Sequence, residues 1–285
     1  MGSRLSTVGA LVAAEVMVVG AIIYALSGAA PRATAVNIGA DRVIGVMNAG
    51  DAPHIVVSDP DSRVVVLAST DGQVHVIDRS EIHGFVIHGP KEYPIPRMTR
   101  TADGVRIERA SNGSWVGVIG ESTARIEIDV PVHAIIDVEK SSGTNVTGMH
   151  GSVYARSQDG SINLHDVSGV VDVKTDDGHI DAIDVQSPKI SLISSSGHLE
   201  LTNVTTTDLK ATTEDGHITA RDMHLDAPGS SVALHTGSGP VEFYGKVAAD
   251  GNYDLSTSDG HIRLDVPELR ALSIHARTQD GSIRV

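Results

Sequence analysis

The sequence predicts an all-β protein: a right-handed parallel β-solenoid with coils of about 18–23 residues, preceded by one N-terminal hydrophobic helix. Three observations support this fold. A motif with a central glycine returns along the chain, as in "KTDDGHIDA", "STSDGHIRL" and "RTQDGSIRV". Apolar and polar residues alternate on both sides of that glycine, and one long apolar run lies near the N-terminus. Repeats of this length are typical of stacked coils.

The motif glycines set the register of the repeat. They are Gly72, Gly160, Gly178, Gly197, Gly216, Gly239, Gly260 and Gly281. From Gly160 onward, subtraction gives steps of 18, 19, 19, 23, 21 and 21 residues. Positions seven and five before each glycine and two and four after it are apolar, so Val65 and Leu67 face inward at the first corner. This alternation predicts two short strands, each with one buried face, that meet at a tight corner.

A hydroxyl side chain stands three residues before every motif glycine. The set is Ser69, Ser157, Thr175, Ser194, Thr213, Thr236, Thr257 and Thr278. Because these residues keep the inward parity, we expect a stacked column that satisfies backbone groups at the bend, rather than a set of nucleophiles. The glycine itself is expected to supply a positive φ at the corner.

Composition excludes several classes of function. The 285-residue chain has a net charge of −14, which disfavours binding to the phosphates of nucleic acids. It has no cysteine, so disulfides, thiolate catalysis and cysteine metal sites are absent. Aromatic residues make up only 3%, which is poor material for stacking on bases or sugars.

Residues 8–26 form the apolar run and are long enough to span a bilayer. We expect a cytoplasmic-membrane anchor in residues 1–27, with the repeat domain outside the cytoplasm. Ala33 and Ala35 resemble a cleavage site, so a secreted protein with a removed signal is the alternative. A linker at 28–40, an N-terminal β region with an irregular cap at 41–120 and the repeat array at 121–285 complete the expected organisation.

The repeat resembles a known family, the bacterial putative-adhesin domains built of β-strand repeats, which are classed as a domain of unknown function. The resemblance covers most of residues 54–285 and rests on "RIEIDVPVHAIIDVEKSSG", "SQDGSINLHDVSGVVDVKTDDGHIDAIDV" and "YDLSTSDGHIRLDVP". It implies a right-handed β-helical or β-roll fold outside the cytoplasmic membrane. It implies no established enzymatic activity and supplies no catalytic residues.

One column of side chains suggests chemistry. His179, His198 and His217 directly follow the glycine in three consecutive coils, and His261 returns two coils later. Equal register would place neighbouring imidazoles about 4.8 Å apart. Such a column could bind a divalent metal or protons, whereas the alternative is a histidine tolerated at an exposed corner. No other cofactor is expected.

These features predict a non-catalytic surface or periplasmic interaction module that binds a protein or an envelope polymer. Two alternatives stay open: a glycan-active β-helix enzyme, which needs paired carboxylates in a groove, and a sensor domain coupled to the membrane segment. The last strand, "GSIRV", leaves unpaired backbone, which would allow a homo-oligomer through the C-terminal solenoid edge.

Overall fold

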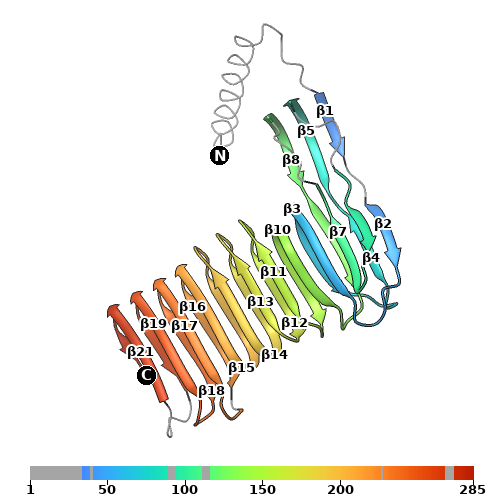
Figure 1. Ribbon diagram of the computed structural model, residues 1–285. Coiled ribbons are helices and arrows are strands. Elements are labelled where there is room, and N and C mark those ends of the chain that lie inside the picture. The colour runs from blue at the N-terminus through green and yellow to red at the C-terminus, as the bar shows by residue number, and fades with distance from the viewer. Residues whose placement is uncertain (1–33, 39–40, 89–93, 111–115, 226, 267–272) are drawn as a thin grey trace, which may run out of the picture.

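The computed structural model describes residues 34–38, 41–88, 94–110, 116–225, 227–266 and 273–285, and every regular element within them is a strand. As the sequence predicts, the strands stack into a parallel β-solenoid (Figure 1). The elements are β1 (Thr34–Ile38), β2 (Arg42–Met47), β3 (His54–Ala68), β4 (Val74–Asp78), β5 (Glu81–His88), β6 (Arg97–Arg100), β7 (Gly104–Glu108), β8 (Val116–Thr123), β9 (Arg125–Val130), β10 (Ile135–Met149), β11 (Val153–Ser157), β12 (Ile162–Ser168), β13 (Val171–Thr175), β14 (Ile180–Ser194), β15 (Leu199–Asp215), β16 (Ile218–Leu225), β17 (Ser231–Ser238), β18 (Val241–Val247), β19 (Asn252–Asp259), β20 (Ile262–Asp265), β21 (Ser273–Asp280) and β22 (Ile283–Arg284).

Each coil contributes one segment to each of two facing ladders. We call the ladder that leads into the glycine corners the entry sheet; it runs through β11, β13, the ends of β14 and β15, β17, β19 and β21. We call the ladder that leaves the corners the exit sheet; it runs through β12, the starts of β14 and β15, β16, β18, β20 and β22. The pairing Ile162↔Ile180↔Leu199↔Ile218↔Val241↔Ile262↔Ile283 reproduces the predicted steps.

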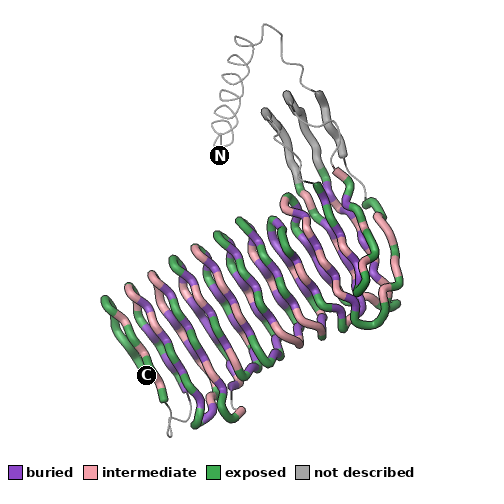
Figure 2. Tube along the Cα trace, viewed as in Figure 1, coloured by how far each residue is buried: buried purple, intermediate pink, exposed green. Residues whose placement is uncertain are grey.

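The core lies between the two ladders and consists of the inward residues of the predicted register. Val171, Val173, Ile180 and Ala182 each have 0% exposure, and their equivalents in the neighbouring coils are buried with them. Buried residues alternate with exposed or half-buried ones along most strands of the array, such as β11, β13 and β17 (Figure 2). The period-two interpretation of the repeat is confirmed.

The hydroxyl column has the expected structural role. Each hydroxyl donates to the carbonyl oxygen of the motif glycine one coil earlier, at 2.7–3.0 Å, for Thr175, Ser194, Thr213, Thr236, Thr257 and Thr278. The hydroxyl oxygen itself accepts the N–H of the glycine three residues later, at Gly160, Gly178 and Gly197. These hydroxyls therefore hydrogen-bond two successive coils at the bend.

The expected reason for the glycines is wrong for most copies. Of the motif glycines, only Gly72 and Gly239 have a positive φ, of 70° and 127°. The remaining copies need glycine because neighbouring coils approach closely. A Cβ on Gly197 would lie 1.8 Å from the carbonyl oxygen of Gly178, and one on Gly281 would lie 1.7 Å from that of Gly260. The space between coils, rather than the backbone conformation, excludes a side chain.

A second corner was not anticipated from the sequence. Six residues after four consecutive glycines the backbone takes a φ of 53–56°, at Asp166, Asp184, Asn203 and Asp222. Asp and Asn tolerate this left-handed conformation better than other L-residues. The side chains also bond along the column, since Asn203 Nδ2 donates to Asp184 Oδ1 at 2.6 Å. In a strict period of two, the inward residue after position four would be at position six. The left-handed residue moves it to position seven, where Val167, Val185, Val204 and Met223 are buried.

Gly72 does not form a corner of the repeat. Val65 pairs with Glu127 and Asn145 on the outward parity, whereas Val64 and Val66 have 0% exposure. The sequence register fails here because β3 runs through its corner and ends in the exit sheet. After it the chain turns back into β4, which pairs antiparallel with β9 and β2.

The N-terminal end of the solenoid is closed by antiparallel strands. β2 pairs with β4, β6 pairs with β7, and Met47 and Met98 pack against the core from these two strands. Beyond them β1, β5 and β8 form a separate three-stranded antiparallel sheet. Residues 34–38, part of the segment expected to be a linker, form β1 and pair with β5.

A buried ionic cluster lies where the polar corner column meets this end. Arg109 Nε donates to Asp59 Oδ2 at 2.8 Å, and its Nη2 donates to Asp78 Oδ1 at 2.9 Å. The three side chains are 0%, 1% and 5% exposed. Asp59 pairs in register with Ser141, which is itself buried beside the corner. The column of polar corner residues thus ends at the Arg109 guanidinium, which is held between the carboxylates of Asp59 and Asp78.

The expected membrane segment, residues 8–26, lies outside the described residues. In the ranges given above, no helix is long and apolar enough to cross a membrane.

The hydroxyl bridges predict a specific loss of stability. Thr213→Val keeps the side-chain shape but removes the donor to the Gly197 carbonyl oxygen, which should lower the free energy of unfolding by about 1–3 kcal/mol. The adjacent Thr212 is the matched control because its side chain is on the outward parity, so Thr212→Val should change stability by less than about 0.5 kcal/mol. Urea unfolding followed by circular dichroism measures both. Equal effects of the two substitutions would contradict a role for the bridge.

Candidate functional site

The three consecutive histidines come together as the sequence predicts. The ring centroids of His179 and His198 are 4.9 Å apart with an interplanar angle of 10°, and those of His198 and His217 are 3.7 Å apart with an angle of 21°. His179 and His198 are exposed, and His217 is half-buried. We call these three residues the histidine column. It stands at the start of the exit sheet, one residue beyond the corner.

Backbone hydrogen bonds join the rings of the histidine column to the next coil. The N–H of His198 donates to Nδ1 of His179 at 3.2 Å, and the N–H of His217 donates to Nδ1 of His198 at 3.4 Å. A ring nitrogen that accepts an N–H bond carries no proton, so the proton of neutral His179 and of neutral His198 is on Nε2. These two imidazoles therefore act as hydrogen-bond acceptors between coils.

Proline interrupts the column after His217. Pro240 has the same register in the next coil, as the bond from Ile218 N–H to Pro240 O shows, and it has no N–H to offer to His217. His261 has the same register one coil further, since Val241 N–H donates to His261 O. Its Nε2 lies 3.7 Å from Glu242 Oε1, and it has no histidine in the adjacent coil before it. The structure therefore separates His261 from the column.

The surroundings disfavour charge on the middle ring. Partial desolvation by its neighbours lowers the pKa of His198 below its ordinary value of 6.5, and the charges that His217 and His179 carry when protonated lower it further. A neutral His198 is also what the bond from the His217 N–H to its Nδ1 requires.

A metal ion would need ligands that converge on one point. Within the parts of the chain that the structure describes, no three His, Asp or Glu side chains are grouped so that they could hold one. Stacked rings point the same way, and a ring whose Nδ1 accepts an N–H presents a protonated Nε2 rather than a lone pair. Metal binding by His179, His198 and His217 stays a prediction.

A row of charged side chains crosses the outer face of the exit sheet beside the histidine column. Arg221 Nη1 lies 3.0 Å from Glu200 Oε1, and its Nη2 lies 4.0 Å from Glu242 Oε2. Asp181 stands opposite Glu200 on the adjacent strand. Burial raises the pKa of Asp181, and the charge of Glu200 raises it further, while His179 lowers it. In this outward row Arg221 thus attracts Glu200, whereas Glu200 and Asp181 repel each other.

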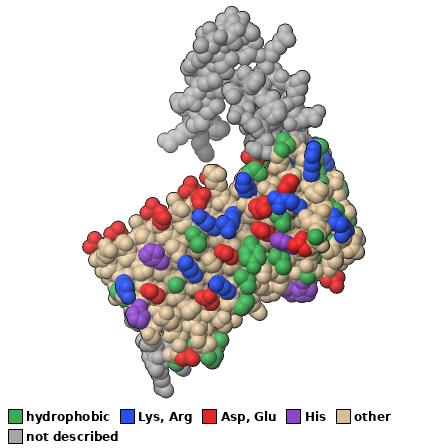
Figure 3. Space-filling model, viewed as in Figure 1, with side chains coloured by type: hydrophobic (Ala, Val, Ile, Leu, Met, Phe, Trp, Pro, Cys, Tyr) green, Lys and Arg blue, Asp and Glu red, His purple; other side chains and the backbone are tan. Residues whose placement is uncertain are grey.

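The glycine edge of the solenoid is acidic. Figure 3 shows Asp and Glu side chains gathered along this edge, at the upper rim of the view. Its exposed carboxylates lie one or two residues before the motif glycines and are Asp159, Asp176, Asp177, Glu214, Asp215, Asp259 and Asp280. The stacking of coils converts a common turn residue into a line of negative charge.

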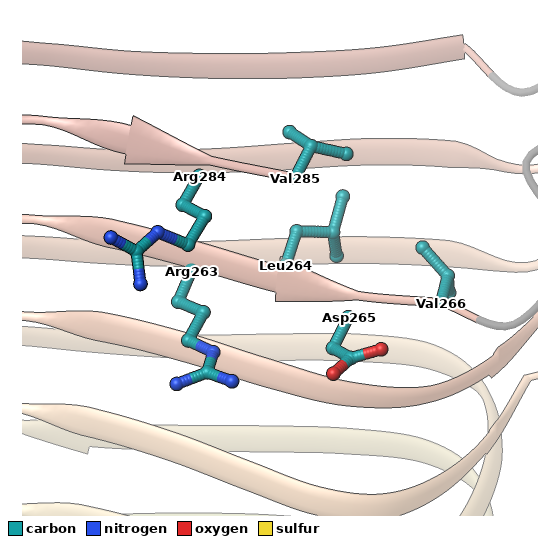
Figure 4. A pocket seen from close by; sticks show the side chains of 6 residues that line it. All are labelled: Arg263, Leu264, Asp265, Val266, Arg284 and Val285. Atoms are coloured by element: carbon teal, nitrogen blue, oxygen red, sulfur yellow. The ribbon is translucent and has the colours of Figure 1, made fainter.

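A pocket lies at the last two strands of the exit sheet. Its lining comes from β20, β22 and the residues that follow them: Arg263, Leu264, Asp265, Val266, Arg284 and Val285 (Figure 4). Leu264 and Val266 are 5% and 8% exposed, whereas Val285 is 65% exposed. The guanidinium of Arg263 packs over the ring of Tyr244, 5.3 Å from its centroid. The pocket is thus an opening into the core beside two cations.

Sequence reasoning missed the hydrogen bonds to the imidazoles and the row of ion pairs. The register of Glu200, Arg221 and Glu242 was readable, because they lie three, five and three residues after their glycines. The pairing of β16 with β18 skips between Ala220 and Met223, next to Arg221. The Asp or Asn at position six was a visible signal for that second corner.

Two solved structures share a distant likeness with the chain. One is described as a putative adhesin from Bacteroides fragilis, with 13% identity, a TM-score of 0.43 and coverage of 89% of this chain and 98% of that one. The other is described as a putative cell adhesion protein from Clostridium sporogenes, with 8% identity, a TM-score of 0.26 and coverage of 87% and 98%. Both likenesses are too distant to carry a function to this chain.

No curated protein matches the sequence. A family model does: the Toastrack DUF4097 model matches residues 54–285, which includes all of the solenoid and, of its N-terminal closure, β4, β6 and β7 but not β2. The family resemblance noted in the sequence covers most of the same residues. The chain belongs to the Toastrack DUF4097 family.

Proposed function

We propose that this chain is a non-catalytic interaction module, held outside the cytoplasm by a membrane anchor at residues 8–26. The observation that carries the proposal is the acidic glycine edge, which repeats in register along a scaffold with a continuous core. Such an edge suits a long partner that makes the same contact in several coils, either a basic protein segment or an envelope polymer with cationic groups. Secretion after signal cleavage would present the same edge.

The chemistry of the repeated residues supports a binding role over catalysis. The corner hydroxyls are buried and donate to glycine carbonyl oxygens, so they have no base beside them to activate a nucleophile. The facing carboxylates Asp181 and Glu200 belong to an outward row in which Arg221 binds Glu200. A glycan-active enzyme would need two acids with separate protonation roles on either side of a bound sugar.

The proposal includes one alternative role and one further partner. As a sensor, the solenoid would be coupled to the membrane segment, so this role depends on residues 8–26. A second copy could pair with β21 and β22, where Ile283 and Val285 are 45% and 65% exposed.

The export proposal has a direct test because the chain lacks cysteine. Ser196→Cys places a thiol on the exposed glycine edge, and a membrane-impermeant maleimide should label it in intact cells. The matched control is Ser194→Cys, two residues earlier and 2% exposed, which should stay unlabelled until the protein is denatured. Labelling of Ser196→Cys only after lysis would place the solenoid in the cytoplasm.

The binding proposal predicts retention by isolated envelope material. The full-length protein should sediment with it, release no reducing sugar ends and detach as the salt concentration rises. Asp177→Ser with Asp215→Ser gives the edge the serine already found at Ser196, and we expect retention to fall several-fold.

The control for this experiment changes the net charge equally at another place. Asp172→Ser with Asp254→Ser removes two exposed carboxylates from the entry sheet and should leave retention unchanged. Equal losses in both variants would mean that net charge alone drives binding. Release of reducing ends would instead favour the glycan-active enzyme.

A further inference from the structure

We propose that His179, His198 and His217 form a proton-binding column that releases the hydrogen bonds between three successive coils when the pH falls. This inference concerns the stability of the glycine edge and does not depend on the proposed function. It rests on the stacked rings, on the two backbone bonds to Nδ1 and on the proline that ends the series.

The neutral column links the coils. The N–H of His198 and that of His217 each end on an imidazole nitrogen of the coil before. Backbone N–H groups at this corner would otherwise need water or another acceptor. Thus Nδ1 of His179 and Nδ1 of His198 accept these N–H bonds in place of the backbone carbonyl oxygens that accept them elsewhere in the sheet.

Protonation reverses the role of the accepting nitrogen. An imidazolium carries a proton on both nitrogens, so Nδ1 becomes a donor and faces another donor. The bond between the two coils is then lost. Protonation of two adjacent rings also places like charges at a centroid distance of 3.7 or 4.9 Å, so that each proton bound makes the next less favourable.

The middle ring is the one most affected. His198 has an imidazole on each side, whereas His179 and His217 each have one. Protonation of His198 therefore meets repulsion from both sides, in agreement with the lowered pKa of this residue. Because the unfolded chain takes up this proton first as the pH falls below 6.5, the free energy of unfolding should decrease through that range.

Other charged groups face the column from the strands and turns packed around it. On the exit sheet and the glycine edge these are Asp176, Asp177, Asp181, Glu200, Glu214, Asp215, Arg221 and Glu242. The carboxylates favour imidazolium and Arg221 disfavours it. Acidification would thus add positive charge beside an acidic edge at the point where the inter-coil bonds break.

His261 is an internal reference. It has the same position after its glycine, but Pro240 and not an imidazole stands in the coil before it. A titration that reports only the general environment of the edge would affect His261 and His198 alike.

Nuclear magnetic resonance titration of the full-length protein from pH 8 to pH 5 tests the coupling. Histidine ring signals, assigned by substitution, should show the midpoint of His198 below 6.5. In the variant His179→Gln with His217→Gln the midpoint of His198 should move up toward 6.5. The matched control His261→Gln should leave it in place. An unchanged His198 midpoint in the double variant would overturn the proposal.

Amide exchange tests the structural consequence separately. After correction for the intrinsic effect of pH, protection of the His217 amide should drop once His198 is protonated, while the Ile180 amide, bonded to His198 O, should stay protected. Protection of His217 that does not change with pH would show that the ring is not its acceptor.

Calorimetry separates protons from metal as the ligand of the column. At pH 7.5 we expect no heat from zinc or calcium. Micromolar zinc binding that disappears in His198→Ala with His217→Ala would instead make these rings metal ligands and overturn the assignment of Nδ1 as an acceptor.

Discussion

The contact between one motif glycine and the carbonyl oxygen of the previous one determines the rest of this structure. The coils approach so closely there that a Cβ would lie within 1.7–2.5 Å of the preceding coil's carbonyl oxygen. The hydroxyl three residues earlier donates to that same oxygen, which fixes the coils in register as well as in distance. Because both groups recur in every copy, the strands on either side cannot slip without losing the hydrogen bond. The insertions therefore collect in the connections away from this corner.

Fixed register is also what gave the sequence its predictive value. The inward positions around Gly178, the steps of the array and the stacking of His179, His198 and His217 all follow from counting residues from one glycine. Counting failed at Gly72, where β3 changes sheets without the usual corner and the parity of Val65 is reversed. It also missed the shift at Asp184, because a left-handed residue adds one position that a strict period of two does not contain.

The N-terminal closure could not be predicted in the same way. Arg109 is 50 residues from Asp59 and 31 from Asp78, and the three share no repeat, so no local pattern marks them as partners. Removing charge from water is costly, and the guanidinium is held by two carboxylates and by the Pro94 carbonyl oxygen. Such a cluster specifies that β3, β4 and the residue after β7 meet at the end of the stack. The coils of the array resemble one another, so their contacts alone do not specify which segments meet there. The antiparallel strands β2 and β6 complete the closure by covering the core at the N-terminal end of the solenoid.

Stacking places each outward residue of the motif next to its own copy one coil away, so like charges repel each other. Charged residues avoid this repulsion where opposite charges alternate, as Arg221 does between Glu200 and Glu242, or where they face water at the glycine edge. Histidine avoids it in another way. A neutral ring can lie on another neutral ring without repulsion, and its acceptor nitrogen binds the next backbone N–H. That solution holds only while the rings are uncharged. The same register that protects the core thus makes this one column depend on protons, and Pro240 limits the dependence to three coils because it has no N–H for a third bond, to His217.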